Sequence, residues 1–125
     1  VLDARALAIP DYDGNGMYRT GGNVLVNAHV GVLFRDFGRP SRLRVNGVDR
    51  IIEADPLCNE FPGSVFIVRV TAERIFPNCP RYLHKMQLIE HSVYSPRPEY
   101  KPPVPAWKTF AAFRDALPAR DRTEE

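Results

Sequence analysis

Hydrophobic and polar residues alternate through the middle of the chain with the period of two that is typical of β-strands. In the first half of residues 41–52 the alternation is strict, with Leu43 on one face and Arg42 and Arg44 on the other. A largely apolar run, residues 30–37, precedes this segment and is joined to it by a turn containing Gly and Pro. The two runs therefore predict a β-hairpin with one face in the core and a cationic, polar face opposite it.

Three further runs predict strands. Residues 64–76 form the longest apolar-rich run, and residues 86–94 predict a last strand. A short strand over residues 7–9 is expected to end at Pro10, because proline cannot donate to a strand ladder. Several short strands with few helices indicate a mainly β domain, and closure into a small barrel is the common way to remove strand edges.

Helical structure is predicted in shorter segments between these strands. Residues 17–26 have apolar side chains at helical spacing, although Gly21 and Gly22 lower the helix propensity by about 1 kcal/mol each. Residues 55–61 predict a short helical link with Pro56 at an early helical position.

The composition changes near the C-terminus, where five prolines follow residue 95 in close order and predict an extended segment. Residues 107–117 then predict an amphipathic helix with aromatic residues on its apolar side. We therefore expect residues 1–94 to form the barrel. Residues 95–125 would form a Pro-rich segment and a helix that packs on the barrel or on a second subunit.

The Gly-rich turn before residues 17–26 has the features of an anion site. The first amides of a helix have no partner inside the helix, and the dipole is positive at this end. Arg19 lies on the first turns and can add a bidentate grip on a phosphate. The alternative is a solvated surface arginine, since most helix starts bind only water.

Three runs in order, IPDYDGNGMYRTGGNVLVNAHVGVLFRDF, PSRLRVNG and IFPNCPRYLHKM, resemble the pyridoxamine 5′-phosphate oxidase-like proteins. Those proteins are split β-barrels that bind flavin mononucleotide (FMN), usually at a homodimer interface. The resemblance covers roughly residues 7–94, and it implies a mainly β split barrel with a few short helices and a C-terminal helix. Family members normally carry further strands upstream, so it also implies that N-terminal strands are missing from this sequence.

The resemblance also implies where FMN would bind. In the family a basic-rich segment holds the phosphate before a helix that ends in an Asn-Pro pair. Asn27 and Ala28 stand in the place of that pair, and counting back puts Arg19 on the family's arginine. Thr20 stands where many members carry lysine, so a hydroxyl replaces one positive charge. The expected cofactor-binding residues are Asn15, Gly16, Met17, Arg19, Thr20, Asn23, Arg44, Arg81, His84 and Lys85.

Some of these residues have a second interpretation. Arg42 and Arg44 either form a solvated face with cross-strand ion pairs or send one side chain to the flavin or the partner subunit. Residues 78–85, which include a possible helical turn over 81–85, gather a thiol, a phenol, an imidazole and two cations. Cys79 in this run is either a reactive thiol or a small buried packing residue.

Other kinds of catalysis find no support in the sequence. The two cysteines and three histidines match no metal-ligand or redox spacing, and we expect reduced thiols and no metal. There is no nucleophile elbow, P-loop or GxGxxG. In a flavin protein the ring performs the redox step and the protein positions it, so no catalytic side chain has to be visible.

Composition and charge limit the number of domains, the kinds of partner and the cellular location that we expect. The chain has 125 residues, enough for one domain, with 44% hydrophobic and 26% charged residues. The net charge of +2, with basic and acidic residues interleaved, does not favour nucleic acid as a partner. No apolar run is long enough to span a bilayer, and no signal-peptide pattern opens the chain. We expect a cytoplasmic protein.

The resemblance implies an FMN-dependent oxidoreductase that acts on an unknown small molecule as a homodimer. The Arg- and His-rich substrate motif of true pyridoxamine phosphate oxidases is not found near the C-terminus. The alternative is a module that binds flavin, or a related cofactor such as a deazaflavin or haem, without turnover.

Overall fold

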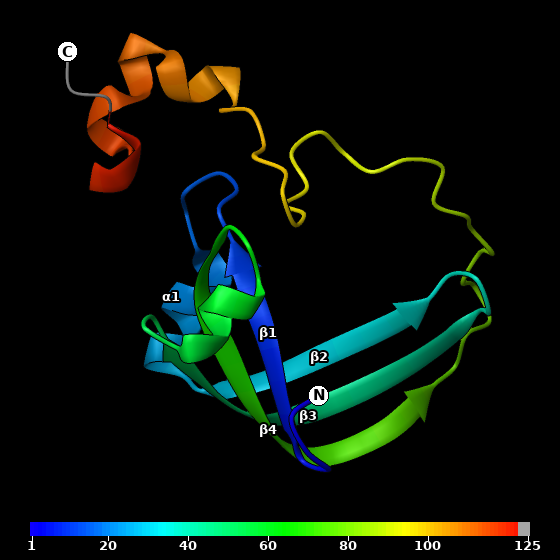
Figure 1. The fold of residues 1–125 in the computed structure, drawn as a ribbon. Helices are drawn as coiled ribbons and strands as arrows, with labels where there is room; N and C mark the ends of the chain where they lie inside the picture. The colour runs from blue at the N-terminus through cyan, green and yellow to red at the C-terminus, as the bar shows by residue number, and fades with distance from the viewer. Residues whose placement is uncertain (123–125) are drawn as a thin grey trace.

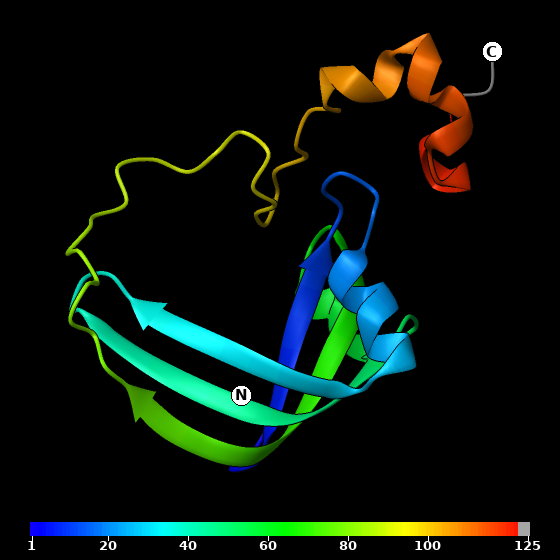
Figure 2. The same ribbon diagram turned by 180° about the vertical axis from the view of Figure 1, so that it is seen from behind.

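The computed structural model describes residues 1–122 and contains one antiparallel sheet of four strands in the order β1-β4-β3-β2 (Figure 1). The strands are β1 (Ala6–Tyr12), β2 (His29–Asp36), β3 (Ser41–Ile52) and β4 (Ser64–Asn78). A single α-helix in this part of the chain, α1 (Arg19–Val26), connects β1 to β2. The sheet curls into half a barrel, which is clearest from behind (Figure 2).

β2 and β3 form the predicted hairpin, and β3 has the predicted bounds. The carboxylate of Asp36 holds the turn between them. Its Oδ1 accepts hydrogen bonds from the backbone N–H groups of Gly38 at 2.9 Å and Arg39 at 3.0 Å. Local turn chemistry of this kind explains why the hairpin was predictable from a short stretch of sequence.

The expected end of the first strand at Pro10 is wrong. β1 continues through Pro10, which lies opposite Ile67, as far as Tyr12. β1 is at the edge of the sheet, where half of the backbone N–H groups face away from the neighbouring strand. A missing N–H is therefore tolerated at this position.

A β-bulge bends the sheet near its middle. β4 has one extra residue, Glu73, between the partners of Asn46 and Gly47. At the same point the backbones of β3 and β4 come very close, since a Cβ added to Gly47 would lie 2.1 Å from the carbonyl oxygen of Thr71. Glycine is therefore required at residue 47 for this curvature.

The core lies where α1 packs on one face of the sheet. A Cβ added to Gly21 would contact Ile51 Cδ1 and Phe66 Cζ, both at 3.4 Å, so the helix backbone lies close to the strands. Among the described residues, the buried hydrophobic side chains are Val24, Val45, Phe66, Val70 and Ala72 on this side, Ile67 on the opposite face of the sheet, and Leu117 after η3.

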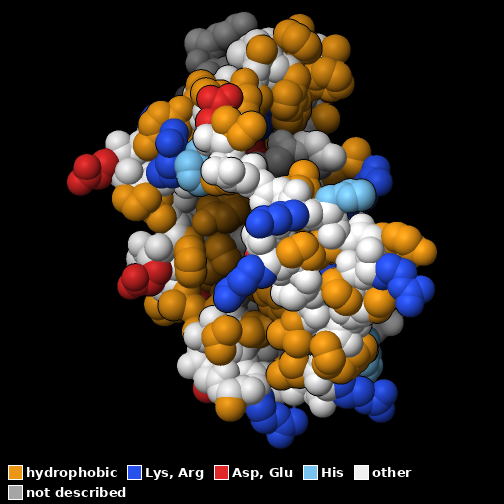
Figure 3. Space-filling model, turned by 90° about the vertical axis from the view of Figure 1, so that its right-hand side faces the viewer, with side chains coloured by type: hydrophobic (Ala, Val, Ile, Leu, Met, Phe, Trp, Pro, Cys, Tyr) orange, Lys and Arg blue, Asp and Glu red, His pale blue; other side chains and the backbone are white. Residues whose placement is uncertain are grey.

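The same face of the sheet remains open beyond α1. By register, Phe34, Leu43 and Ile75 share the face of Val45, and their exposed fractions are 42%, 42% and 54%. Hydrophobic side chains also gather around a hollow on the side of the molecule shown in Figure 3, with Lys or Arg side chains beside it. An incomplete barrel leaves this apolar surface uncovered in the single chain.

The predicted link before β4 is the short 3₁₀ helix η1 (Pro56–Glu60), with Pro56 at its start. The Asp55 carboxylate caps it by accepting a hydrogen bond from the Leu57 backbone N–H at 3.0 Å. The same carboxylate is bound by Arg69 of β4, so the cap also ties the link to the sheet.

The predicted last strand over residues 86–94 is wrong. Its N-terminal end bonds once to the hairpin, from the Met86 N–H to the Phe37 carbonyl at 2.9 Å, and the chain then arches away from the sheet (Figure 1). Period-two alternation makes a strand only where another strand edge lies alongside, and this segment has none. Residues 81–85 contain no helix; the nearest backbone turn joins the Leu83 N–H to the Pro80 carbonyl at 2.8 Å.

The predicted helix over residues 107–117 is instead two 3₁₀ helices, η2 (Ala106–Thr109) and η3 (Ala111–Ala116), followed by η4 (Ala119–Asp121). Phe110 between η2 and η3 has an extended backbone, with φ −75° and ψ 127°, and interrupts the helix. The Phe113 ring then packs near Phe110 and Trp107, with centroids 6.3 Å and 6.1 Å away. Within residues 1–122, no helix is long and apolar enough to cross a membrane.

Candidate anion-binding site at the start of α1

The loop between β1 and α1 is shaped by a local turn. Asn15 Oδ1 accepts a hydrogen bond from the Met17 backbone N–H at 3.1 Å. Gly16 has a φ of 74°, in the left-handed region that favours glycine. This turn delivers Arg19 and Thr20 to the first turn of the helix.

Tyr18 directly precedes α1 in a left-handed conformation, with φ 43° and ψ 43°, which is uncommon for a residue other than glycine. The helix predicted to begin at residue 17 therefore begins at Arg19. No side chain caps the helix. The Gly22 N–H donates a hydrogen bond to the Tyr18 carbonyl at 2.8 Å. The amides before Gly22 have no acceptor inside the helix, and two of them belong to the exposed residues Arg19 and Thr20.

A hollow of about 350 Å³ lies against this helix start. Four of the residues predicted from the sequence line it together: Asn15, Gly16, Arg19 and Thr20. Asp11 also lines it, and its carboxylate opposes the positive charge of Arg19. The site thus offers backbone amides, a hydroxyl and one guanidinium to a phosphate, with one nearby negative charge against it.

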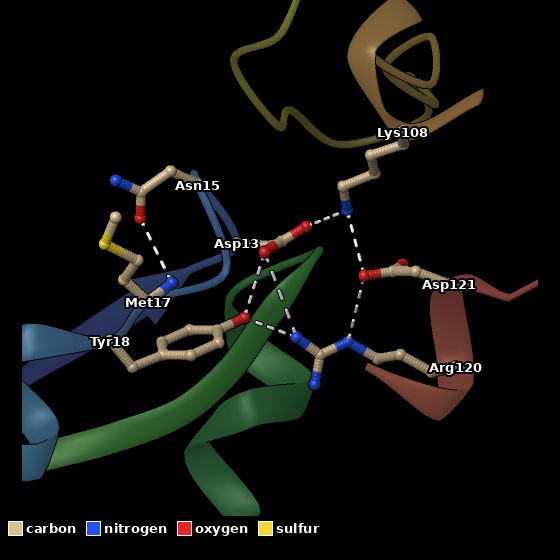
Figure 4. Close-up of polar contacts among 7 residues, drawn as sticks. All are labelled: Asp13, Asn15, Met17, Tyr18, Lys108, Arg120 and Asp121. Atoms are coloured by element: carbon tan, nitrogen blue, oxygen red, sulfur yellow. Dashed lines mark hydrogen bonds and ion pairs between the residues drawn. The ribbon is translucent and has the colours of Figure 1, made fainter. Parts of the chain in front are cut away.

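Residues 95–122, the C-terminal segment, contact the same loop through a cluster of polar side chains (Figure 4). The Lys108 ammonium donates to the carboxylates of Asp13 and Asp121, the latter at 3.0 Å. The Tyr18 hydroxyl donates to Asp13 Oδ1 at 3.0 Å and accepts a hydrogen bond from the Arg120 guanidinium. Two residues of the loop are therefore held by two cations of the C-terminal segment.

The charges in this cluster are matched. Burial raises the pKa of Asp13, but hydrogen bonds from Lys108 and Tyr18 outweigh it, so the pKa lies below the usual 3.8. Burial lowers the pKa of Lys108, and its bonds to Asp13 and Asp121 reverse this, so the pKa lies above 10.5. Burial and the bond to Asp13 raise the pKa of Tyr18 above 10.0. Asp13 and Lys108 are both charged at neutral pH.

Sequence reasoning missed this cluster. Lys108 is 95 residues from Asp13, and Arg120 is 102 residues from Tyr18. No pattern within one segment points to such a contact. The sequence does show an acidic residue in a Gly-rich turn and basic residues in an aromatic C-terminal segment. Their opposite charges indicate a contact only when the fold is known to bring the two segments together.

The remaining predicted residues lie elsewhere in the single chain. Met17 and Asn23 are exposed, in the loop and on α1 respectively. Arg44 is on the face of β3 opposite to α1, where its Nη1 would lie 3.1 Å from a Cβ added to Gly31. Its position agrees with the predicted cationic face, but it is not part of the hollow at the helix start.

Arg81, His84 and Lys85 are exposed in the segment after β4, which bonds through Met86 to Phe37 of the hairpin turn. They do not line the hollow at the start of α1. Cys79 in the same segment is exposed, so the interpretation as a buried packing residue is wrong. Among the described residues, no group of three His, Cys, Asp or Glu could hold a metal ion.

Asp49 is a buried acid that belongs to none of these groups. Asp49 of β3 keeps 5% of its surface exposed, and its Oδ1 has no hydrogen-bond partner. Burial raises the pKa of this carboxyl above the usual 3.8, against the effect of a hydrogen bond from the backbone of Arg50. It lies on the apolar, α1-facing side of the sheet and does not line the hollow at the start of α1.

Comparisons with known proteins support the fold. No protein-family model matches the sequence, and no curated protein matches it. Among solved structures the chain is similar to HupZ from Group A Streptococcus, with a TM-score of 0.51 and 16% sequence identity. The match covers 62% of this chain and 66% of the HupZ chain, slightly less than two thirds of its length. The curled antiparallel sheet, its few short helices and this likeness together show a mainly β fold of the split-barrel type.

Proposed function

We propose that this protein binds FMN, with the phosphate at the start of α1, and uses it in the oxidation or reduction of a small molecule. The observation that carries the proposal is the uncapped start of α1 beside a hollow lined by Arg19 and Thr20. Both residues are among the cofactor-binding residues that the resemblance implies, which supports the proposal.

The residues present fit a phosphate. The Arg19 guanidinium supplies two parallel donors, the Thr20 hydroxyl supplies a third, and the free amides of the first turn complete the set. Asp11 lowers the net attraction, which favours modest affinity. A bound flavin would supply hydride or electron transfer, and the protein's part would be to hold and orient it.

The proposal includes a homodimer. Arg81, His84 and Lys85 lie outside the hollow at the helix start, so one chain does not assemble all the expected cofactor contacts. A second copy can bring them together and can also cover the exposed apolar residues Phe34 and Ile75. Sedimentation of the purified protein would test this, and a monomer at micromolar concentration would contradict it.

A visible absorption spectrum of the purified protein, with the supernatant after heat denaturation, tests the cofactor. We expect flavin absorption bands and released FMN. A colourless protein that does not take up added FMN would exclude the flavoenzyme function and leave a scaffold or another ligand.

The alternative function is a module that binds flavin, or a deazaflavin or haem, without turnover. Thr20 in the place of the usual lysine favours it, because a weaker phosphate grip suits reversible binding. Flavin bands without oxidation of a reduced nicotinamide would support the non-catalytic flavin module. Haem or deazaflavin bands would identify a different cofactor.

A further inference from the structure

We propose that the C-terminal segment acts as a clamp that positions the phosphate-binding loop, with Lys108 and Arg120 as its positioning residues. The inference rests on the proposed function, since it assigns to these two cations a role in FMN binding. The clamp is the set of contacts from Lys108 and Arg120 to Asp13 and Tyr18 (Figure 4).

Lys108 is the buried half of the clamp. Its side chain is 8% exposed, although lysine is rarely buried unless it is paired. Its ammonium lies between the carboxylates of Asp13 in the loop and Asp121 in η4. The contact therefore joins the loop to two separate turns of the C-terminal segment.

Arg120 holds the residue at the helix start. Its guanidinium donates to the Tyr18 hydroxyl and lies 4.0 Å from both Asp13 and Asp121. The Tyr18 ring also packs against Phe66, with 5.7 Å between the ring centroids. A tyrosine in a left-handed conformation persists only where its surroundings hold it, and these contacts are what hold it.

The clamp also changes the charge beside the hollow. Asp13 is in the loop next to Gly14 and Asn15, two residues that line the hollow. Unpaired, its carboxylate would repel a phosphate together with Asp11. Lys108 neutralises Asp13 directly, so the C-terminal segment makes the loop suitable for an anion.

Binding of FMN and riboflavin to Lys108→Met tests the clamp, because the two ligands differ by the phosphate alone. We expect the Kd for FMN to rise about tenfold and the Kd for riboflavin to stay within about twofold. Lys101→Met is the matched control, since Lys101 is an exposed lysine of the same segment, and it should leave both affinities unchanged.

A second substitution separates positioning from a general loss of structure. Asp13→Asn added to Lys108→Met removes the carboxylate left unpaired, and we expect it to recover part of the FMN affinity. Trp107, the one tryptophan of the chain, lies 5.8 Å from the Lys108 ammonium, and its fluorescence reports whether the segment stays folded. If Lys108→Met does not fold, the same measurement of FMN and riboflavin binding is made on Arg120→Met.

Equal losses of FMN and riboflavin binding would overturn the clamp, as would unchanged FMN binding in both Lys108→Met and Arg120→Met. In either case the proposed function would stand, because wild-type protein would still bind FMN. Wild-type protein that binds neither ligand would instead overturn the proposed function, and the clamp with it.

Discussion

Asp55 and Arg69 form a two-bond ion pair that fastens η1 to β4. Arg69 Nε lies 2.5 Å from Asp55 Oδ2, and Nη2 lies 2.9 Å from Oδ1. The Asp55 side chain is 1% exposed, and the same carboxylate caps η1 through Leu57. Three hydrogen bonds to one buried carboxylate make it a fixed point of the fold.

Asp55→Asn should destabilise the protein at neutral pH. The bonds from Arg69 and then Leu57 hold the pKa of Asp55 below 3.8, so its contribution to stability is present above pH 3.8 and is lost as pH falls through the folded-state pKa. Urea unfolding across this range should show the two proteins converging at low pH. A difference in the free energy of unfolding between the two proteins that does not change with pH would contradict the ionic origin of the effect.

Gly47→Ala should lower the free energy of unfolding by roughly 3 kcal/mol, because the new methyl group would meet the Thr71 carbonyl oxygen and force β3 and β4 apart. Gly22→Ala is the matched control. No atom lies within 4 Å of a Cβ at Gly22, so alanine there should stabilise α1 by about 0.5–1 kcal/mol. Chemical denaturation of the two variants measures both changes, and equal effects would contradict the close approach at Gly47.

Asp49→Asn should stabilise the protein at neutral pH. Burial raises the pKa of Asp49, so the charged form is disfavoured in the fold, and stability is lost as pH rises from 3.8 through the folded-state pKa. Replacing the carboxyl by a neutral amide removes this loss. The gain in the free energy of unfolding should disappear below pH 3.8, and a gain of equal size at low pH would show that charge is not the cause.

Arg19→Ala should weaken FMN retention roughly 10- to 100-fold, since it removes a charge-assisted, bidentate contact with the phosphate. Arg39→Ala is the control, because Arg39 is exposed in the hairpin turn and pairs with Asp36. Flavin fluorescence quenching measures both affinities. Equal retention by Arg19→Ala and wild type would place the phosphate elsewhere.

The hydrogen-bond partners of the loop before α1 show which contacts could be predicted from the sequence and which could not. The turn at Asn15 and Gly16 and the position of Arg19 could be predicted, because they depend on residues next to one another. Asp13 could not be paired with Lys108, because hydrogen bonding between them depends on how the whole C-terminal segment folds back. For Arg44, the alternation along β3 predicted on which face of the sheet it lies. The alternation did not show that this position is away from the hollow at the start of α1.

The sequence by itself determined the hairpin of β2 and β3, the start of β4 and the loop before α1. Alternation, turn residues and glycines act over a few neighbours, so their effect is visible in the chain. The tertiary structure alone decided that residues 86–94 form no strand, that Gly47 faces Thr71 and that Lys108 reaches Asp13. Each of these depends on which segments lie side by side, and the free energy of such contacts belongs to pairs of residues that are distant in sequence.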